Sequence, residues 1–144
     1  SSTFWTERSG SVAALETLKQ MEKIKSWELI TKKGTKIQNK WNEIGKNNNI
    51  KINVLGIPAL STFSIESKNW LKYKTFITQE MLKKKMLCSN ALFLSVKHDE
   101  KTLNNYLDNL NEIFKKISKF ENESLNIDNY LDGPVCQSGF QRLN

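Results

Sequence analysis

The sequence predicts an α+β domain in which amphipathic helices cover one face of a small sheet. Two observations predict this class: the long segments carry apolar residues at helical spacing, and three short segments between them have the patterns of strands. The expected order is helix, helix, strand, strand, helix, strand, helix, which makes an α+β layer. The chain has 144 residues, enough for one domain with its own core.

The first part of the chain predicts two helices, or one helix that continues through both stretches. Gly10 is expected to turn the chain into a first helix that begins near Val12. In this first stretch apolar residues recur every three positions: Val12, Leu15, Leu18, Met21 and Ile24. In the second they alternate between steps of three and four: Trp27, Ile30, Gly34, Ile37, Trp41 and Ile44. We expect these stripes to be core. We also expect the first helix and Phe4-Trp5 to pack on a missing domain, so that in the isolated chain they form an exposed apolar patch that frays or self-associates. At Gly34 the missing side chain allows another element to approach closely, and Gly45 with the asparagines at 47–49 ends the helix.

A strand pair and a third helix are predicted next. Residues 50–54 alternate between apolar and polar and predict a half-buried strand. Residues 56–58 turn the chain, and residues 59–65 predict a second strand. Residues 70–86 predict a helix with Trp70, Tyr73, Ile77, Met81 and Leu82 on one side. Lys83–Lys85 at its end suit the negative end of the helix dipole.

The last third predicts one more strand and a long helix. The run from Ala91 to Val96 is almost continuously apolar and predicts a central strand. Asp99 is expected to cap a helix whose apolar face runs from Leu103 to Phe120. Residues 124–131 predict at most a short helix, which Asp132-Gly133-Pro134 ends.

Composition excludes several classes of function. The formal net charge is +7, but the lysines are spread along the polar sides of helical patterns, which favours a solvated surface over a nucleic-acid site. Cys88, Cys136 and His98 have no metal-binding spacing, and His98 is expected to order a turn rather than to act in catalysis. No apolar run is long enough to cross a membrane. We therefore expect a cytoplasmic protein with reduced thiols.

The opening residues are the one candidate site. Ser1, Ser2 and Thr3 offer hydroxyls just ahead of a predicted helix, and Arg8 could add a guanidinium group that binds an anion. Hydroxyls and free backbone N–H groups at a helix N-terminus can bind a phosphate. The same residues are also common as simple helix caps, and from the residues alone the capping interpretation is favoured.

Several motifs change that balance because they resemble one enzyme family. "SSTFWTER-G" followed by "AALETL" is similar to the segment after the cofactor lysine in class III pyridoxal-phosphate (PLP) aminotransferases, in the group resembling glutamate-1-semialdehyde 2,1-aminomutase. The resemblance continues in the same order through "GIPALSTFSI", "YKTFITQEML", "SNALFLSVKH" and "LDGPVCQSGFQRLN". It implies that residues 1–10 belong to the cofactor-site and dimer region and that residues 11–144 form the aminotransferase small C-terminal domain. That domain has a three- to four-stranded, mostly antiparallel sheet in the fold-type-I architecture.

The resemblance also implies roles and partners. Thr3 matches a family threonine that contacts the cofactor phosphate of the neighbouring subunit, with Ser2 beside it. The parent would be a homodimer whose N-terminal large domain holds pyridoxal phosphate and acts on a small amino acid or carbonyl substrate. Where the family continues with Ser-Gly-Asn-Pro, this chain has Phe4-Trp5-Thr6-Glu7, so the substrate stays open.

The cofactor lysine is expected to precede Ser1, so the isolated chain should lack the reaction. Its own part would be to close the substrate site and to contribute dimer contacts. Two alternatives remain: a stand-alone basic interaction domain, and an inactive relic of an enzyme.

Overall fold

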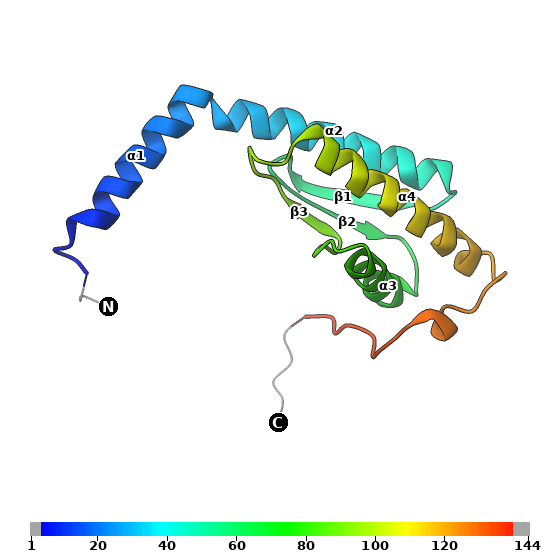
Figure 1. Cartoon of the computed structure of the whole chain (residues 1–144). Coiled ribbons are helices and arrows are strands. Elements are labelled where there is room, and N and C mark those ends of the chain that lie inside the picture. Colours follow the sequence, from blue (N-terminus) through cyan, green and yellow to red (C-terminus); the bar gives the residue numbers. More distant parts are fainter. Residues whose placement is uncertain (1–3, 140–144) are drawn as a thin grey trace.

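The computed structural model describes residues 4–139, which form four helices, a short 3-10 helix and one small sheet. Figure 1 shows α2, α3 and α4 gathered around the sheet, while α1 projects away from it. The α+β class and the predicted order of the elements are confirmed. The elements are α1 (Arg8–Ile24), α2 (Ser26–Asn47), β1 (Ile52–Ile57), β2 (Leu60–Ile65), α3 (Trp70–Lys83), β3 (Ala91–Phe93), α4 (Glu100–Glu121) and the 3-10 helix η1 (Ile127–Tyr130).

The sheet is antiparallel and has the order β1-β2-β3. β1 and β2 form a hairpin in which Ile52 pairs with Ile65 and Ile57 pairs with Leu60. The prediction that residues 91–96 form a central strand is wrong, because β2 is central and β3 is an edge strand of three residues. The first strand also lies further along the chain than the predicted 50–54.

The core lies between one face of the sheet and helices α2, α3 and α4. Trp41 of α2 packs edge-on against Phe63 of β2, with 4.9 Å between the ring centroids. The Trp41 indole Nε1 donates a hydrogen bond of 3.0 Å to the buried Tyr106 hydroxyl of α4. α4 buries its whole predicted stripe: Leu103, Tyr106, Leu107, Leu110, Ile113, Phe114, Ile117 and Phe120.

The third helix follows its predicted pattern with two differences. Tyr73, Ile77 and Met81 are buried as expected, and Phe76 joins them in the core. Leu82 was expected on the same side, but it lies exposed near the end of the helix. The helix ends at Lys83, three residues before the predicted boundary.

The long fourth helix begins where the sequence predicts. The Asp99 carboxylate accepts a 2.7 Å hydrogen bond from the backbone N–H of Thr102, which confirms the expected cap. This bond stabilises the charged carboxylate and so lowers the pKa of Asp99.

The first two helices are separate, and a single residue divides them. Lys25 has φ 48° and ψ 51°, a left-handed conformation that both ends α1 and precedes α2. Two expectations for this region are wrong. α1 begins at Arg8, so Gly10 lies inside the helix and does not turn the chain into it. The α1 stripe is not core, because α1 has no buried residue.

Candidate functional site

The residues that the sequence singles out for cofactor binding, Ser2 and Thr3, lie outside the part of the chain that the structure describes. The two aromatics that follow are described. Phe4 is 70% exposed and Trp5 is 84% exposed. Phe4 accepts a hydrogen bond from the Glu7 N–H at its backbone oxygen, which forms a turn just ahead of α1. Two large aromatic side chains therefore stand in solvent at the start of a projecting helix.

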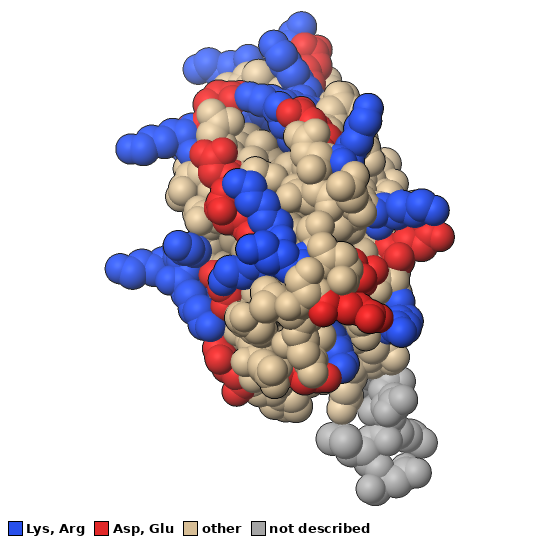
Figure 2. Space-filling model, turned by 90° about the vertical axis from the view of Figure 1, so that its right-hand side faces the viewer, with Lys and Arg blue, Asp and Glu red and all other residues tan. Residues whose placement is uncertain are grey.

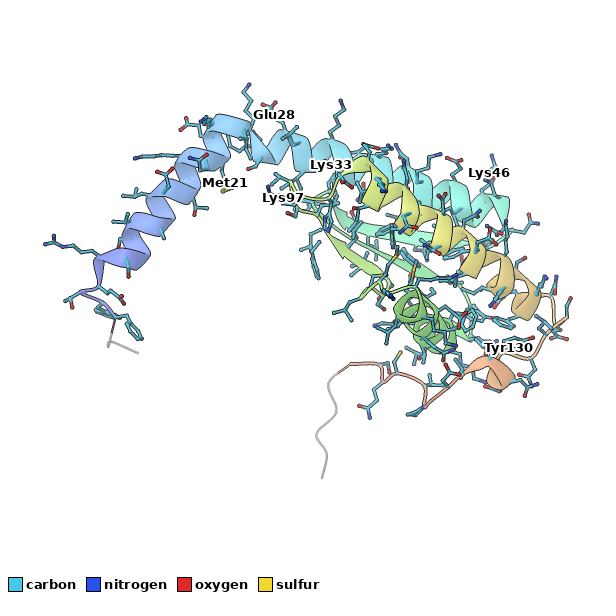
Figure 3. All side chains as sticks on the ribbon, in the orientation of Figure 1. Met21, Glu28, Lys33, Lys46, Lys97 and Tyr130 are labelled. Atoms are coloured by element: carbon cyan, nitrogen blue, oxygen red, sulfur yellow. The ribbon has the colours of Figure 1, made fainter. Side chains whose placement is uncertain are left out.

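The apolar residues of α1 lie on more than one side of the helix. A step of three residues falls about 60° short of a full turn, so the line from Val12 to Ile24 winds around the axis. Met21 and Ile24 line a shallow groove at the α1–α2 junction, opposite Leu94 and Val96. Figure 3 shows Met21 on the side of α1 that faces the rest of the domain.

Val12, Leu15 and Leu18 do not line this groove and are 62%, 60% and 61% exposed. Exposed apolar residues are ordinary when they are scattered singly, but here three of them lie within two turns of one helix. This side of α1 has no cover among the described residues.

A second uncovered apolar surface lies on the sheet. Ile57, Leu60 and Phe93 are cross-strand neighbours in one row that crosses all three strands. They are 66%, 44% and 68% exposed, whereas Phe63 on the opposite face is buried. Leu55 adds a further exposed side chain on the same face, since side chains along β1 alternate between the two faces. We call Leu55, Ile57, Leu60 and Phe93 the open-face cluster.

The tip of the β1–β2 hairpin, which carries part of this cluster, is held firmly by α2. A Cβ built on Gly34 would lie 1.9 Å from the Pro58 oxygen, so the two backbones meet at the point that the sequence marked for a close approach. The Gln38 amide Nε2 donates to the Gly56 oxygen at 3.1 Å and to the Ser61 hydroxyl at 2.9 Å. The buried Ser61 hydroxyl in turn donates to the Ile57 oxygen at 3.1 Å.

His98 orders a turn, as predicted. Its ring Nδ1 accepts a 3.0 Å hydrogen bond from the backbone N–H of Ser95. The ammonium of Lys33, on α2, donates to the backbone oxygens of Val96 and His98 at 3.0 and 2.6 Å. Figure 3 shows Lys33 beside the segment that carries Lys97. This histidine and lysine thus fasten the segment between β3 and α4 to α2.

Pyridoxal phosphate needs a sheltered lysine amine to form its Schiff base. None of the lysines in the described range is buried, and the amine of Lys33 is already bonded to two carbonyl oxygens. Residues 4–139 therefore do not by themselves fit the covalent site of this cofactor. What the chain could still supply is a phosphate contact from the opening hydroxyls and a wall formed by its uncovered apolar surfaces.

The lysines that give the chain its positive charge are interspersed with carboxylates. Glu80 contacts both Lys83 and Lys116 at 2.9 and 3.3 Å, and Lys72 lies 2.6 Å from Asp128. Burial opposes the charge of Glu80, but hydrogen bonds led by that from Lys83 outweigh it and lower the pKa of Glu80. Figure 2 shows basic and acidic side chains mixed across one face of the molecule. That face presents no large area of a single sign.

Two buried or half-buried titratable groups lie away from these surfaces. The Tyr73 hydroxyl donates a 2.5 Å hydrogen bond to the Glu121 carboxylate, and burial together with this bond raises the pKa of Tyr73 to about 12. Burial also raises the pKa of Cys88, which disfavours the nucleophilic thiolate. Both arrangements stabilise neutral side chains within the packed domain.

Residues 4–139 contain no group of three or more histidine, cysteine, aspartate or glutamate side chains arranged to hold a metal ion. None of the helices in this range is long and apolar enough to span a membrane.

Comparison of this chain with protein-family models, with curated proteins and with solved structures found no match.

Proposed function

We propose that this chain supplies the C-terminal small domain of a PLP-dependent enzyme of the class III aminotransferase type, similar to glutamate-1-semialdehyde 2,1-aminomutase. Its role is to cover the substrate site of a large cofactor-binding domain and to contribute contacts in a homodimer. The cofactor, when bound by the large domain, supplies the electron sink for amino transfer. The residues of this chain position the substrate, cover its site and exclude water from it.

The structural observation that supports this proposal is the open-face cluster. A sheet with helices on one face and apolar residues on the other is suited to packing between its helices and a second body. The row from Ile57 through Leu60 to Phe93 crosses every strand. A domain that packs on this row would therefore contact all three strands of the sheet. The resemblance of the motifs from the opening "SSTFWTER" to the tail "CQSGFQRLN" implies that this second body is the large cofactor-binding domain.

The opening residues have a defined part in the proposal. The Thr3 hydroxyl would donate to the cofactor phosphate across the dimer interface, and the exposed Phe4 and Trp5 would wall the site. A hydrogen bond to a charged group contributes about 1.5–3 kcal/mol. Thr3→Val keeps the shape of the side chain and removes this donor.

The experiment begins with the reading frame that contains Ser1. The protein encoded by the whole frame is purified, and amino transfer from amino-acid donors is measured with added pyridoxal phosphate. Cofactor affinity is then titrated by absorbance for the unmutated protein, for Thr3→Val and for the matched control Ser1→Ala. We expect Thr3→Val to weaken cofactor binding about tenfold to a hundredfold and Ser1→Ala to weaken it less.

Three results would contradict the proposal. One is a start codon directly before Ser1, which would favour a stand-alone interaction domain or a relic. Another is unchanged cofactor affinity in Thr3→Val, which would leave the opening hydroxyls as simple helix caps. The third is a stoichiometric adduct at one lysine of the 144-residue chain after incubation with pyridoxal phosphate and borohydride, read from the intact mass.

A further inference from the structure

We propose that α1 pairs antiparallel with α1 of a second copy of this chain, through the side of the helix that faces away from its own domain. The contact is centred on Leu15, which meets its symmetry mate on a twofold axis. This pairing involves only the side chains of α1 and the residues next to it, so it does not depend on the enzyme identity proposed above.

The first step is the line of residues on that side. Arg8, Leu15 and Glu22 are separated by seven residues, which is close to two turns, so they lie along one side of α1. Val12 and Leu18 flank Leu15 three residues to either side. Ser11 and Lys19, four residues to either side of Leu15, lie on it as well, and in the pair described below they face each other. This side therefore has a leucine at its centre, mixed apolar and polar neighbours and opposite charges at its two ends.

The second step is charge complementarity. In an isologous pair every contact occurs twice, and residues at equal distances from the axis face each other. With Leu15 on the axis of an antiparallel pair, Arg8 of one copy faces Glu22 of the other, and Val12 faces Leu18. Within residues 4–139, neither Arg8 nor Glu22 takes part in an ion pair. A parallel pair would instead oppose like charges.

The third step is the available area. α1 is about 25 Å long at 1.5 Å per residue. Beyond its start, Phe4 and Trp5 would reach the α1–α2 junction of the second copy, where Trp27 is 50% exposed. Burying a large apolar side chain contributes about 1.5–3 kcal/mol, which at ~25 cal/mol per Å² corresponds to ~60–120 Å² of buried surface. The exposed side chains Phe4, Trp5, Val12, Leu15, Leu18 and Trp27 would thus bury at most roughly 360–720 Å² per copy. This is less than the ~800 Å² per partner of a standard interface, so we expect a weak dimer whose population depends on protein concentration.

The test is the oligomeric state of the full 144-residue chain, measured by sedimentation equilibrium over a range of protein concentrations. We expect the unmutated chain to form a dimer. Leu15→Glu places two like charges beside each other on the axis, and we expect it to weaken association at least tenfold. Thr17→Glu adds the same charge on the side of α1 that lines the groove, so it is the matched control and should leave the dimer unchanged.

A charge exchange tests the antiparallel register itself. Arg8→Glu alone and Glu22→Arg alone each oppose like charges twice in the dimer, and we expect each to weaken association about threefold to tenfold. The double variant Arg8→Glu/Glu22→Arg restores both pairs and should return to within about twofold of the unmutated chain. Circular dichroism of each variant checks that the helix content of the chain is unchanged.

Other modes of association give different results, each of which would overturn the proposal. A monomer at all concentrations means that α1 does not pair with itself. A dimer that survives Leu15→Glu but is lost in Phe93→Glu means that the second copy covers the open-face cluster. A double variant no better than the single variants means that Arg8 and Glu22 do not face each other.

Discussion

α1 and α4 both carry apolar residues at regular intervals, yet α4 buries eight residues and α1 buries none. α4 carries its apolar residues in alternating steps of three and four, which keeps them on one side of the helix that packs on the core. α1 carries them in steps of three, which distributes them around the axis. α4 also begins at a side-chain cap, whereas Glu7 ahead of α1 makes no such hydrogen bond. Apolar residues on a helix therefore indicate that it packs against something. Whether they share one side of the helix indicates whether a single core can bury them all.

The largest expected difference between the two helices is in the cost of removing a leucine. Leu110 of α4 is fully buried, so Leu110→Ala should lower the free energy of unfolding by about 3–5 kcal/mol through lost burial and a residual cavity. Leu15→Ala should change the free energy of unfolding by no more than about 0.5 kcal/mol when the protein concentration is low enough for the chain to be a monomer. Urea denaturation of both variants checks this, and equal losses would mean that α1 is part of the cooperative core.

A pair of glycine variants extends the comparison to α2. Gly34→Ala places a Cβ against the Pro58 backbone and should cost about 2–4 kcal/mol, because the hairpin must move. Gly10 in α1 has nothing within 4 Å of an added Cβ, so Gly10→Ala should stabilise α1 by up to about 1 kcal/mol through helix propensity. Thermal unfolding followed by circular dichroism separates the two. A harmless Gly34→Ala would contradict the close contact.

Alkaline pH should test the Tyr73 contact that ties α3 to the end of α4. Burial, together with the bond to Glu121, raises the folded pKa of Tyr73 to about 12 from an ordinary value of 10.0, so the stability linked to the neutral phenol is fully present below pH 10. As pH rises from 10 to 12 the unfolded phenol loses its proton first, and about 1–3 kcal/mol of stability should be lost. Tyr73→Phe has no phenol and should lack this component. Stability curves of both proteins against pH provide the measurement.

The smallest expected effect concerns the helix starts. Asp99→Ala removes the bond to the Thr102 N–H and should cost about 0.5–2 kcal/mol. Glu7→Ala should cost little, since Glu7 makes no capping hydrogen bond to α1. Chemical denaturation of the two variants gives the comparison, and a larger loss for Glu7→Ala would show a role for this residue outside helix capping.

Much of the fold could be predicted because its core helices keep one phase. The stripe of α4, the Asp99 cap and the hairpin followed directly from spacing and turn residues. The length and position of the third strand could not be predicted from its apolar run. Leu92 and Leu94 pack on the core, whereas Val96 lines the α1–α2 groove. A run of apolar residues does not reveal that they serve two surfaces.

The break at Lys25 had a signal that periodicity alone could have revealed. Extending the three–four stripe of α2 backward from Trp27 leads to Lys23, Gln20 and Glu16, which are polar. The apolar phase therefore changes at the junction, although neither glycine nor proline marks it. The candidate cofactor contacts at Ser2 and Thr3 rest on the resemblance, while the open-face cluster emerges only from strand pairing, which brings Ile57, Leu60 and Phe93 together.

The contact between Gly34 and Pro58 has a consequence for any body that covers the sheet. Docking normally loses free energy when mobile side chains and loops become ordered, at about 0.5–1.5 kcal/mol for each immobilised side chain. Here α2 and the Gln38–Ser61 hydrogen bond fix the hairpin backbone during folding. The open-face cluster is thus preorganised at its hairpin end, and the ordering entropy of that end has been lost before any partner arrives.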